Sequence, residues 1–244
     1  MRFAIITVLY GDSTADFMKF LECNHKHIIE QNLKIFIIDN GNHDFTIKES
    51  TNISVIKNNN NGFSKSINKG LKILYKEYEY ALIVNPDLMF NVDEFISMIP
   101  ELTTDFSVIE TKEYDQSVSI RYFNKITGKV SMRKGFSGIE YFNGPAFTLS
   151  KVCFEKVGGF DERYFLYFED LDFSIKLHSH GFPLNVVKSK SFIHTPASSS
   201  SNIAKRERIA AISGLKFTFK HLKLNLFLYI RYIIKYIFSS CREK

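Results

Sequence analysis

The chain has 244 residues, of which 45% are hydrophobic and 15% aromatic, a composition that excludes an intrinsically disordered protein and provides for a large packed core. Its net charge of +6 is unevenly distributed, because residues 203–244 hold ten Lys or Arg against two acids, whereas the preceding 202 residues carry 22 basic and 24 acidic groups. A nucleic-acid-binding protein usually carries its positive charge on the folded face, so no nucleic-acid partner is expected.

The cysteines and the N-terminal residues exclude further classes. Cys23, Cys153 and Cys241 lie far apart and form no CxxC pair, which argues against a disulfide framework or a zinc site. The first residues, MRFAIITVLYGD, hold too short an apolar segment for a signal peptide and no small-residue cleavage site. We therefore expect a cytoplasmic protein that begins with a β-strand.

Strand and helix patterns alternate over the first hundred residues. The apolar run FAIITVLY predicts a strand, and Ser13 or Thr14 in the following turn is placed to cap a helix. The expected elements are a helix ending near residue 31, strands at 34–40, 53–59 and 80–87, and a helix at 63–78. This order predicts a doubly wound, Rossmann-like sheet, in which ligands bind beyond the carboxyl ends of the strands.

Polar residues stand at the ends of three of these strands. Thr7 and Tyr10 lie near the end of the first strand, Asp39 and Asn40 end the second, and Asp87 follows the fourth within VNPD. VNPD by itself is more typical of a simple turn. At a strand end of an open sheet, however, a carboxylate is well placed to ligate Mg²⁺ or Mn²⁺ on a diphosphate.

Three further segments carry weaker signals. In NNGFSKSINKG, Gly62 permits close approach of the backbone to a ligand, although a lone glycine in a turn is usually structural. Residues 103–135 lose the alternation and are expected to form short strands and loops. His194 follows a short strand in FIHTP, where a single histidine is more often a hydrogen-bonded core residue than a ligand.

Acidic residues interrupt an aromatic run in YFLYFEDLDF, residues 164–173. The pattern predicts a helix that begins at about Glu169, with Gly181 after its end, and acids favour the first turn of a helix. Capping accounts for one or two of the acids Glu169, Asp170 and Asp172. It does not account for the four aromatic residues that precede them.

The tail combines apolar residues with positive charge. Residues 216–238 carry five Lys or Arg, and their longest charge-free run is seven residues, too short for a transmembrane helix. As one helix, these residues would place the five cations within an arc of about 120°. The pattern predicts a helix that lies in an anionic membrane interface, and packing on the domain or on a second subunit is the alternative.

Taken in order, the motifs TVLY, IIDN, NNGFSKSINKG, VNPD and VGGFDERYFLYFEDLDFSIKLHSHGF, followed by His194, resemble family 2 of the glycosyltransferases, most closely its bacterial rhamnosyltransferase-like branch. The resemblance extends over residues 3–200. It implies a GT-A fold, an α/β/α sandwich around a mixed, mostly parallel sheet, with C-terminal amphipathic helices added. The implied domains are a catalytic domain at 1–202, with a nucleotide-binding half at 1–100 and an acceptor half at 101–202, and a basic tail at 203–244.

The resemblance also implies where a nucleotide sugar binds. The residues that would line its pocket are Thr7, Tyr10, Asp39, Asn40, Gly62, Asn68, Asn85 and Asp87. NPD corresponds to the DxD metal motif of the family, with Asn85 in place of the first Asp. Asp87 would then ligate Mg²⁺ or Mn²⁺, and His194 would be a second contact to the metal or the diphosphate.

The same resemblance makes Asp170 the general base, supported by Glu169 and Asp172. A sugar hydroxyl is a poor nucleophile and needs a carboxylate to take its proton, while a leaving nucleoside diphosphate needs positive charge. Aromatic residues beside Asp170 would exclude water, raise its pKa and offer faces for sugar stacking. A single direct displacement inverts the anomeric carbon, so the implied enzyme is an inverting hexosyltransferase.

Within this branch, the implied donor is dTDP-rhamnose and the implied acceptor is a polyprenyl-diphosphate-linked glycan of O-antigen or capsule type. Such an acceptor lies at the inner face of the bacterial membrane. The tail at 216–238 would hold a cytoplasmic, peripherally bound enzyme beside it. A homodimer through the same tail is the competing expectation.

Three alternatives to this function stay open. In the first alternative, the donor is a UDP-sugar, with galactofuranose, glucose or N-acetylglucosamine, in place of dTDP-rhamnose. A nucleotidyltransferase would share the nucleotide-binding half, but YGDST is not the Gly-rich basic loop that usually follows its first strand. A non-catalytic sugar-nucleotide-binding protein is disfavoured because both Asp87 and Asp170 are present.

Overall fold

A seven-stranded sheet forms the centre of the computed structural model, which describes residues 2–10, 14–41, 51–114, 116–135, 137–195 and 203–242. The strand order is β13-β6-β12-β4-β1-β2-β3. The strands are β1 Phe3–Leu9, β2 Lys34–Asp39, β3 Ile53–Lys57, β4 Tyr80–Val84, β6 Phe106–Ile109, β12 Ala146–Ser150 and β13 Asn185–Val187. Strand β12 is antiparallel to both neighbours and the other pairings are parallel, which confirms the predicted mixed sheet.

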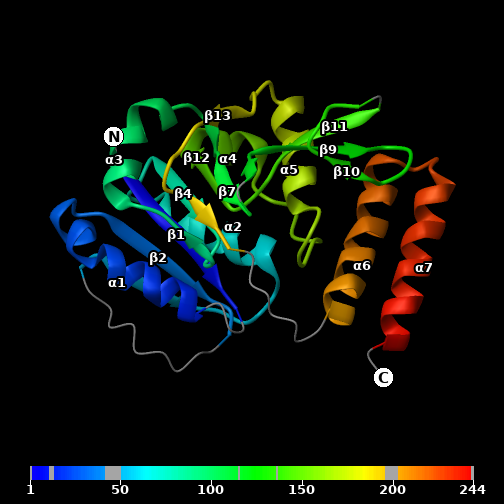
Figure 1. Ribbon diagram of the computed structural model, residues 1–244, viewed down its shortest axis with the longest axis horizontal. Coiled ribbons are helices and arrows are strands. Elements are labelled where there is room, and N and C mark those ends of the chain that lie inside the picture. The colour runs from blue at the N-terminus through cyan, green and yellow to red at the C-terminus, as the bar shows by residue number, and fades with distance from the viewer. Residues whose placement is uncertain are drawn as a thin grey trace.

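Helices cover both faces of this sheet (Figure 1). They are α1 Thr14–Glu30, α2 Phe63–Leu74, α3 Val92–Leu102, α4 Lys151–Val157 and α5 Glu169–Ser179. Because successive strand residues point to opposite faces, Ile6 packs in one core cluster with Ile67 of α2. Its neighbour Ile5 packs in the other cluster, with Phe17 of α1 and Phe95 of α3. The predicted α/β/α sandwich is confirmed.

The predicted elements of the first half are present with small shifts at their ends. The helix predicted to reach residue 78 ends at Leu74, and the strand predicted to reach residue 87 ends at Val84. Pro86 has no N–H with which to continue the strand ladder, so the chain turns there. Ser13, one of the two predicted helix caps, and the predicted domain boundary at residue 202 lie outside the described residues.

Two small sheets replace the alternation in the second half, as predicted for residues 103–135. One is β10-β9-β11, from Val130–Ser131, Ile120–Asn124 and Gly138–Phe142. The other is β5-β14-β7-β8, from Leu88–Met89, Ile193–His194, Thr111–Glu113 and Gln116–Val118. In this second sheet His194 pairs with Leu88, so the histidine is brought beside the turn that carries Asp87.

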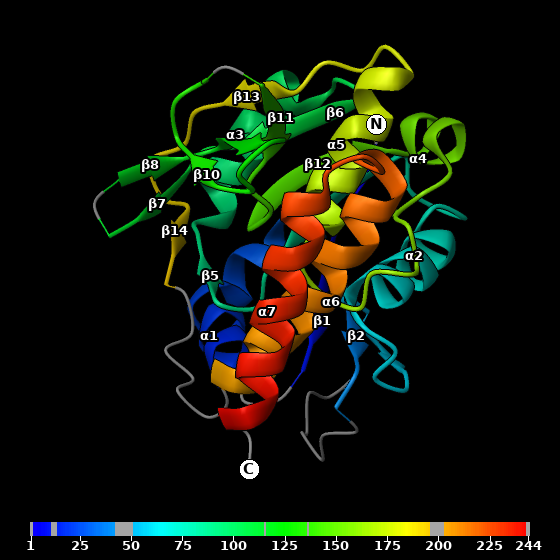
Figure 2. The same cartoon turned by 90° about the vertical axis from the view of Figure 1, so that its right-hand side faces the viewer.

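The tail forms two helices, α6 Ile203–His221 and α7 Leu226–Arg242, which lie side by side as a hairpin next to α5 (Figures 1 and 2). The prediction of one helix through residues 216–238 is therefore wrong, and so is the single arc of five cations. Asn225 explains the break, because its side chain accepts a hydrogen bond from Leu228 N at 3.0 Å and caps α7. Lys216 and Lys220 lie on α6, whereas Arg231 and Lys235 lie on α7.

One side of the hairpin packs on the domain and the other is exposed. Phe217, Leu228 and Tyr232 share a buried cluster with Phe123 and Leu171 of the domain. The exposed apolar residues of α7 are Leu226, Phe227, Ile230, Ile233, Ile234, Ile237 and Phe238. Within the described residues, no helix has the length and apolar character needed to span a membrane. Packing on the domain, one of the alternatives for the tail, thus describes α6 and the inner face of α7.

Candidate active site

The carboxyl ends of β1 and β2 lie side by side, because the strands are parallel and Leu9 pairs with Asp39. The Asp39 carboxylate is fully buried and accepts hydrogen bonds from Lys57 Nζ at 2.8 Å and from Gly41 N at 3.0 Å. The next residue, Asn40, is also buried and accepts a bond from Ser66 Oγ at 2.8 Å. These contacts hold two predicted pocket residues at the edge of the sheet.

Two other predicted pocket residues lie at the same edge. Thr7 is fully buried, and within the described residues its hydroxyl has no hydrogen-bond partner. Tyr10 follows β1 and exposes 43% of its surface. Desolvation of the Tyr10 hydroxyl and the nearby charge of Asp87 raise its pKa to about 12, so this phenol stays protonated at neutral pH.

Asp87 and His194 meet beyond the end of β4. Asp87 Oδ1 lies 3.3 Å from His194 Nε2, and 15% and 11% of the two side chains are exposed. The other ring nitrogen of His194 is 3.9 Å from Glu113 Oε2. The histidine is therefore placed between two carboxylates rather than among apolar core residues.

Asp87 and His194 are the candidate ligands for the implied divalent metal. Within the described part of the chain, no three His, Cys, Asp or Glu side chains converge as a metal-binding group. Asp87 and His194 nevertheless provide one carboxylate oxygen and one imidazole nitrogen that lie 3.3 Å apart. Mg²⁺ is commonly held by one or two protein ligands together with substrate phosphates and water, and Mn²⁺ accepts the same oxygen ligands. The pair fits a metal that arrives with a diphosphate.

A pair of acids begins α5. Burial raises the pKa of Glu169, and the charge of Asp170 raises it further. Burial also raises the pKa of Asp170, but the Leu171 N–H at 2.7 Å and the guanidinium of Arg121 oppose this. Asp170 is thus the acid of the pair that loses its proton first, and as a carboxylate it can accept a proton from a hydroxyl group.

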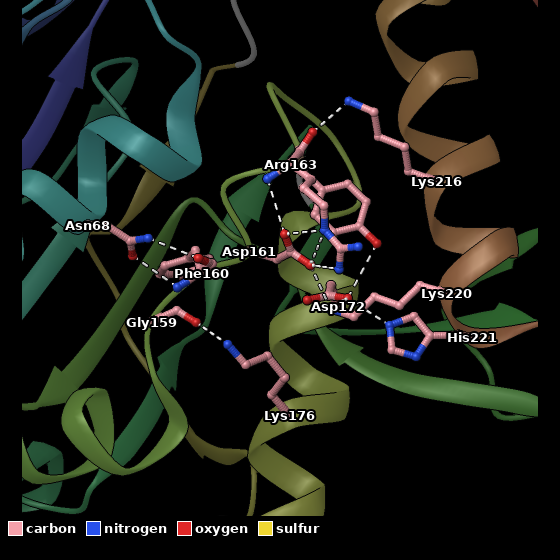
Figure 3. Close-up of polar contacts among 11 residues, drawn as sticks. Asn68, Gly159, Phe160, Asp161, Arg163, Asp172, Lys176, Lys216, Lys220 and His221 are labelled. Carbon is pink, nitrogen blue, oxygen red and sulfur yellow. Dashed lines mark hydrogen bonds and ion pairs between the residues drawn. The ribbon is translucent and has the colours of Figure 1, made fainter.

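Asp172 points elsewhere, into a contact with the tail (Figure 3). Its buried carboxylate lies 2.6 Å from Lys220 Nζ and 2.7 Å from His221 Nε2, and the Tyr164 hydroxyl donates to it at 3.3 Å. Residues two apart on a helix are separated by about 200° around its axis, which directs Asp170 and Asp172 to different sides. That Asp172 supports the base directly stays a prediction.

The aromatic residues before α5 pack on the tail. The Phe168 ring lies 5.4 Å from Phe217 and 5.7 Å from Tyr232, between ring centroids. Tyr167 and Phe168 both have a left-handed backbone, with φ of 67° and 71°. Such non-glycine conformations cost energy and persist where surrounding contacts hold them. These contacts hold the Phe168 ring against the tail, and sugar stacking by the aromatic run stays a prediction.

Gly62 and Asn68 connect the start of α2 to the loop before α5. Gly62 has φ 89°, and a Cβ atom there would lie 2.4 Å from Phe165 O. Asn68 donates to Phe160 O and accepts from Phe160 N, both at 2.9 Å (Figure 3). Their contacts hold this loop, and direct contact with a nucleotide sugar stays a prediction.

Four residues of the site make contacts that were not predicted from the sequence. Arg121 on β9 lies 3.6 Å from Glu113 on β7, which links His194 to the surroundings of Asp170. Arg206 of α6 donates from Nε to the Tyr167 hydroxyl at 3.1 Å. Three of the four lie in the irregular region or the tail, where periodicity indicates neither their partners nor their direction. The fourth, Tyr167, belongs to the aromatic run for which the sequence predicted water exclusion and sugar stacking, and its bond to Arg206 was not predicted.

Comparison with known proteins gives both a family and a fold. Residues 18–172 match the family model described as "Glycosyl transferase family 2". An N-acetylglucosaminyl-diphospho-decaprenol L-rhamnosyltransferase of Mycobacterium tuberculosis is 36% identical over 62 residues, which are 25% of this chain and 20% of that protein. The match thus spans about a fifth of the curated relative.

Solved structures share the fold over nearly the whole chain. S. aureus TarS 1-349 superimposes with a TM-score of 0.58 at 17% identity, covering 98% of this chain and 81% of that one. The mannosyltransferase PcManGT from Pyrobaculum calidifontis, solved with GDP-Man and Mn²⁺, has a TM-score of 0.60 at 12% identity, covering 98% and 73%. At such identities the likeness concerns the fold alone.

Proposed function

The chain belongs to glycosyl transferase family 2, and from this premise we propose that it is an inverting glycosyltransferase that uses a nucleotide-sugar donor. The observation that carries the proposal is the pair of half-buried acids Glu169 and Asp170 at the start of α5, together with the Asp87–His194 pair beyond β4. The Glu169–Asp170 pair can supply a general base, and the Asp87–His194 pair can bind the diphosphate of a donor through a metal.

In the proposed reaction, the Asp170 carboxylate takes the proton of the acceptor hydroxyl. The hydroxyl oxygen forms a bond to the anomeric carbon as the bond from that carbon to the diphosphate oxygen breaks. The electron pair of the broken bond leaves with the nucleoside diphosphate, and the single displacement inverts the carbon. Glu169, whose pKa is raised by burial and by Asp170, stays protonated beside the base and limits the repulsion between them.

Asp87 and His194 are the residues that would hold Mg²⁺ or Mn²⁺. When bound, such an ion neutralises charge on the diphosphate of the donor. The fold relative PcManGT was solved with GDP-Man and Mn²⁺, which supports a divalent ion as the cofactor class. Thr7, Tyr10, Asp39 and Asn40 would line the neighbouring nucleotide pocket, with Asn85, Gly62 and Asn68 completing the predicted set.

For the donor we propose dTDP-rhamnose, and for the acceptor a lipid-linked glycan on a polyprenyl diphosphate. Support comes from the partial match to a rhamnosyltransferase whose printed name includes a diphospho-decaprenol acceptor. A UDP-sugar is the second candidate, because S. aureus TarS was solved in complex with UDP-GlcNAc. Thermal-shift binding of dTDP-rhamnose, UDP-galactose, UDP-glucose and UDP-GlcNAc, each with and without Mn²⁺, decides between them.

We also propose that the exposed apolar face of α7 binds an anionic membrane surface at the cytoplasmic side. Seven apolar residues, defined above, face outward on α7, and Lys235 and Arg231 of the same helix and Lys223 before it supply positive charge. An amphipathic helix with basic residues binds such a surface through apolar burial and electrostatic attraction. A second copy of the chain on this face is the competing outcome.

The variant Asp170→Asn tests the proposed reaction. We expect donor binding within about twofold of wild type and transfer reduced by about 10² to 10⁴, the usual contribution of a general base. Glu155→Gln, which removes an exposed acid of α4, serves as the control and should transfer normally. Near-normal transfer by Asp170→Asn would exclude Asp170 as the base.

A further inference from the structure

A pocket lies between the two tail helices and Tyr167, which stands two residues before α5. Its volume is about 240 Å³, and its lining residues are Tyr167, Ile203, Arg206, Glu207, Ala210 and Lys235. Arg206, Lys235 and Glu207 are among these lining residues, so the formal charge of the lining is positive. The volume is several times the roughly 30 Å³ that one water occupies in the liquid, which leaves room for a phosphate group.

The contact between Arg206 and Tyr167 leaves hydrogen-bonding capacity directed at another group. Arg206 donates from Nε to the Tyr167 hydroxyl at 3.1 Å, and no partner for its two terminal amino groups is found among the described residues. The Tyr167 hydroxyl accepts that bond, so its own proton is available to a further acceptor. A guanidinium fork together with a hydroxyl donor matches the geometry of phosphate oxygens.

The pocket lies next to the start of α5, because Tyr167, which lines it, is two residues before Glu169. Besides the bond to Tyr167, the negative charge of Asp87 raises the pKa of Arg206. Conversely, Tyr167, Arg206 and Glu169 all influence the pKa of Tyr10. Charges act in this way over short distances, so Arg206 lies within electrostatic reach of the residues proposed to handle the donor diphosphate.

Contacts between the tail and the domain hold α6 and α7, which carry these cations, in place. Lys220 bridges Asp161 and Asp172 with distances of 2.7 and 2.6 Å, and Lys216 donates to Arg163 O at 2.6 Å (Figure 3). The two helices touch closely at Gly214, where a Cβ atom would lie 2.5 Å from the Tyr232 ring. The positions of Arg206 on α6 and Lys235 on α7 are therefore set by packing, as a preformed binding pocket requires.

We propose that Arg206, Lys235 and Tyr167 form a binding pocket for a diphosphate group beside the active site. This rests on the proposed function, in which the donor and the lipid-linked acceptor each carry a diphosphate. A diphosphate presents several acceptor oxygens and multiple negative charges, and charge-assisted bonds to Arg and Lys are the strong ones. The tail thereby contributes ligands for a substrate as well as a surface.

Calorimetric binding of inorganic pyrophosphate in the presence of EDTA tests the pocket without the metal site. We expect Arg206→Gln and Lys235→Gln each to weaken binding at least tenfold, and Tyr167→Phe to weaken it about threefold. Lys26→Gln, which removes an exposed cation from α1, should bind as wild type does. Unchanged melting temperatures confirm that the variants are folded. Wild-type affinity in Arg206→Gln and Lys235→Gln would overturn the proposal.

Two further ligands identify the source of the diphosphate. If Arg206→Gln weakens dTDP and UDP but not farnesyl diphosphate, the pocket serves the donor, and the reverse pattern assigns it to the lipid acceptor. Loss of pyrophosphate binding in the variants of a protein that shows no sugar transfer would leave the pocket standing and refute the proposed reaction. The two proposals thus fail separately.

Discussion

Three carboxylates within four residues at the start of α5 have different surroundings. Glu169 and Asp170 are desolvated beside each other, and burial raises the pKa of both. Burial also acts to raise the pKa of Asp172, but hydrogen bonds from His221 and Lys220 outweigh it and lower that pKa. Ionised Asp172 therefore stabilises the fold, whereas ionisation of the Glu169–Asp170 pair works against it.

The sign of this second effect gives a prediction for Glu169→Gln. When the pKa of a carboxyl group is raised in the folded state, the protein loses stability as the pH rises from the pKa of the unfolded state through the raised pKa. At pH 8 the free energy of unfolding of Glu169→Gln should exceed that of wild type by on the order of 1 kcal/mol, which corresponds to about 2 to 4 °C in Tm. At pH 5 the two proteins should differ little. Thermal melts of both proteins at the two pH values measure it. An equal difference at pH 5 and pH 8 contradicts it.

The close backbone contact at Gly62 leads to a prediction for which Gly158 provides the control. Gly62 and Gly158 both have positive φ, but a Cβ atom at Gly62 would meet Phe165 O at 2.4 Å, whereas Gly158 faces open space. Gly158→Ala should cost about 1 to 2 kcal/mol for the left-handed backbone alone. Gly62→Ala should cost a further 1 to 3 kcal/mol or so for the displaced loop. Urea unfolding of the two variants decides, and equal losses would remove the role given to the close contact.

At the scale of elements, the hairpin of α6 and α7 is fixed to α5 by ionic and aromatic contacts. Lys220 and His221 converge on the Asp172 carboxylate, while Phe217 and Tyr232 pack on Phe168. A buried ion pair that loses one partner leaves the other charge uncompensated. The attachment of the tail therefore depends on both members of each pair.

Lys220→Met tests this attachment. The side chain of Lys220 is 26% exposed and that of Asp172 fully buried, so the variant should lose about 1 to 3 kcal/mol of unfolding free energy. Limited proteolysis should also cut the tail earlier. Lys216→Met, which loses a single bond to a backbone carbonyl, is the matched control and should lose less. Equal proteolysis rates for Lys220→Met and wild type would argue against the ionic attachment.

The sequence predicted the central sheet and its flanking helices well, because apolar periodicity reports which face of a strand or helix is buried. It also predicted that Asp87 and His194 belong to one site, and the structure places them 3.3 Å apart. The break in the tail was missed, since the apolar pattern continues across it and a single Asn225 makes the cap. The direction of Asp172 was missed as well, because its partners lie about fifty residues later in the chain.

At the scale of the whole molecule, one face of the hairpin is available to a large partner. Ile230, Ile234 and Ile237 are each about half exposed on α7, with fractions of 49%, 47% and 53%. The buried face of the same helix carries Leu228 and Tyr232, which pack on the domain. The molecule thus presents a second, outward apolar surface that its own fold leaves open.

Flotation with vesicles tests the membrane proposed for this surface. Wild-type protein should bind vesicles that contain anionic lipid and bind neutral vesicles less, and Ile234→Asp should bind about tenfold less tightly. Ile29→Asp, at a residue of α1 with 53% exposure, should not alter binding. Failure of wild type to float, with a dimer in sedimentation that Ile234→Asp dissociates, would assign the face to a second copy of the chain.

The position of Asp172 has a thermodynamic consequence for regulation. Two residues after the proposed base, it holds the hairpin whose outer face is proposed to meet the bilayer. Any coupling free energy transmitted through this carboxylate acts equally in both directions. If docking on lipid tightens the affinity for a substrate analogue by some factor, the analogue must tighten the affinity for lipid by the same factor. Binding to the membrane would then change the affinity of the enzyme for its substrate, as an allosteric effector does, without a separate regulatory domain.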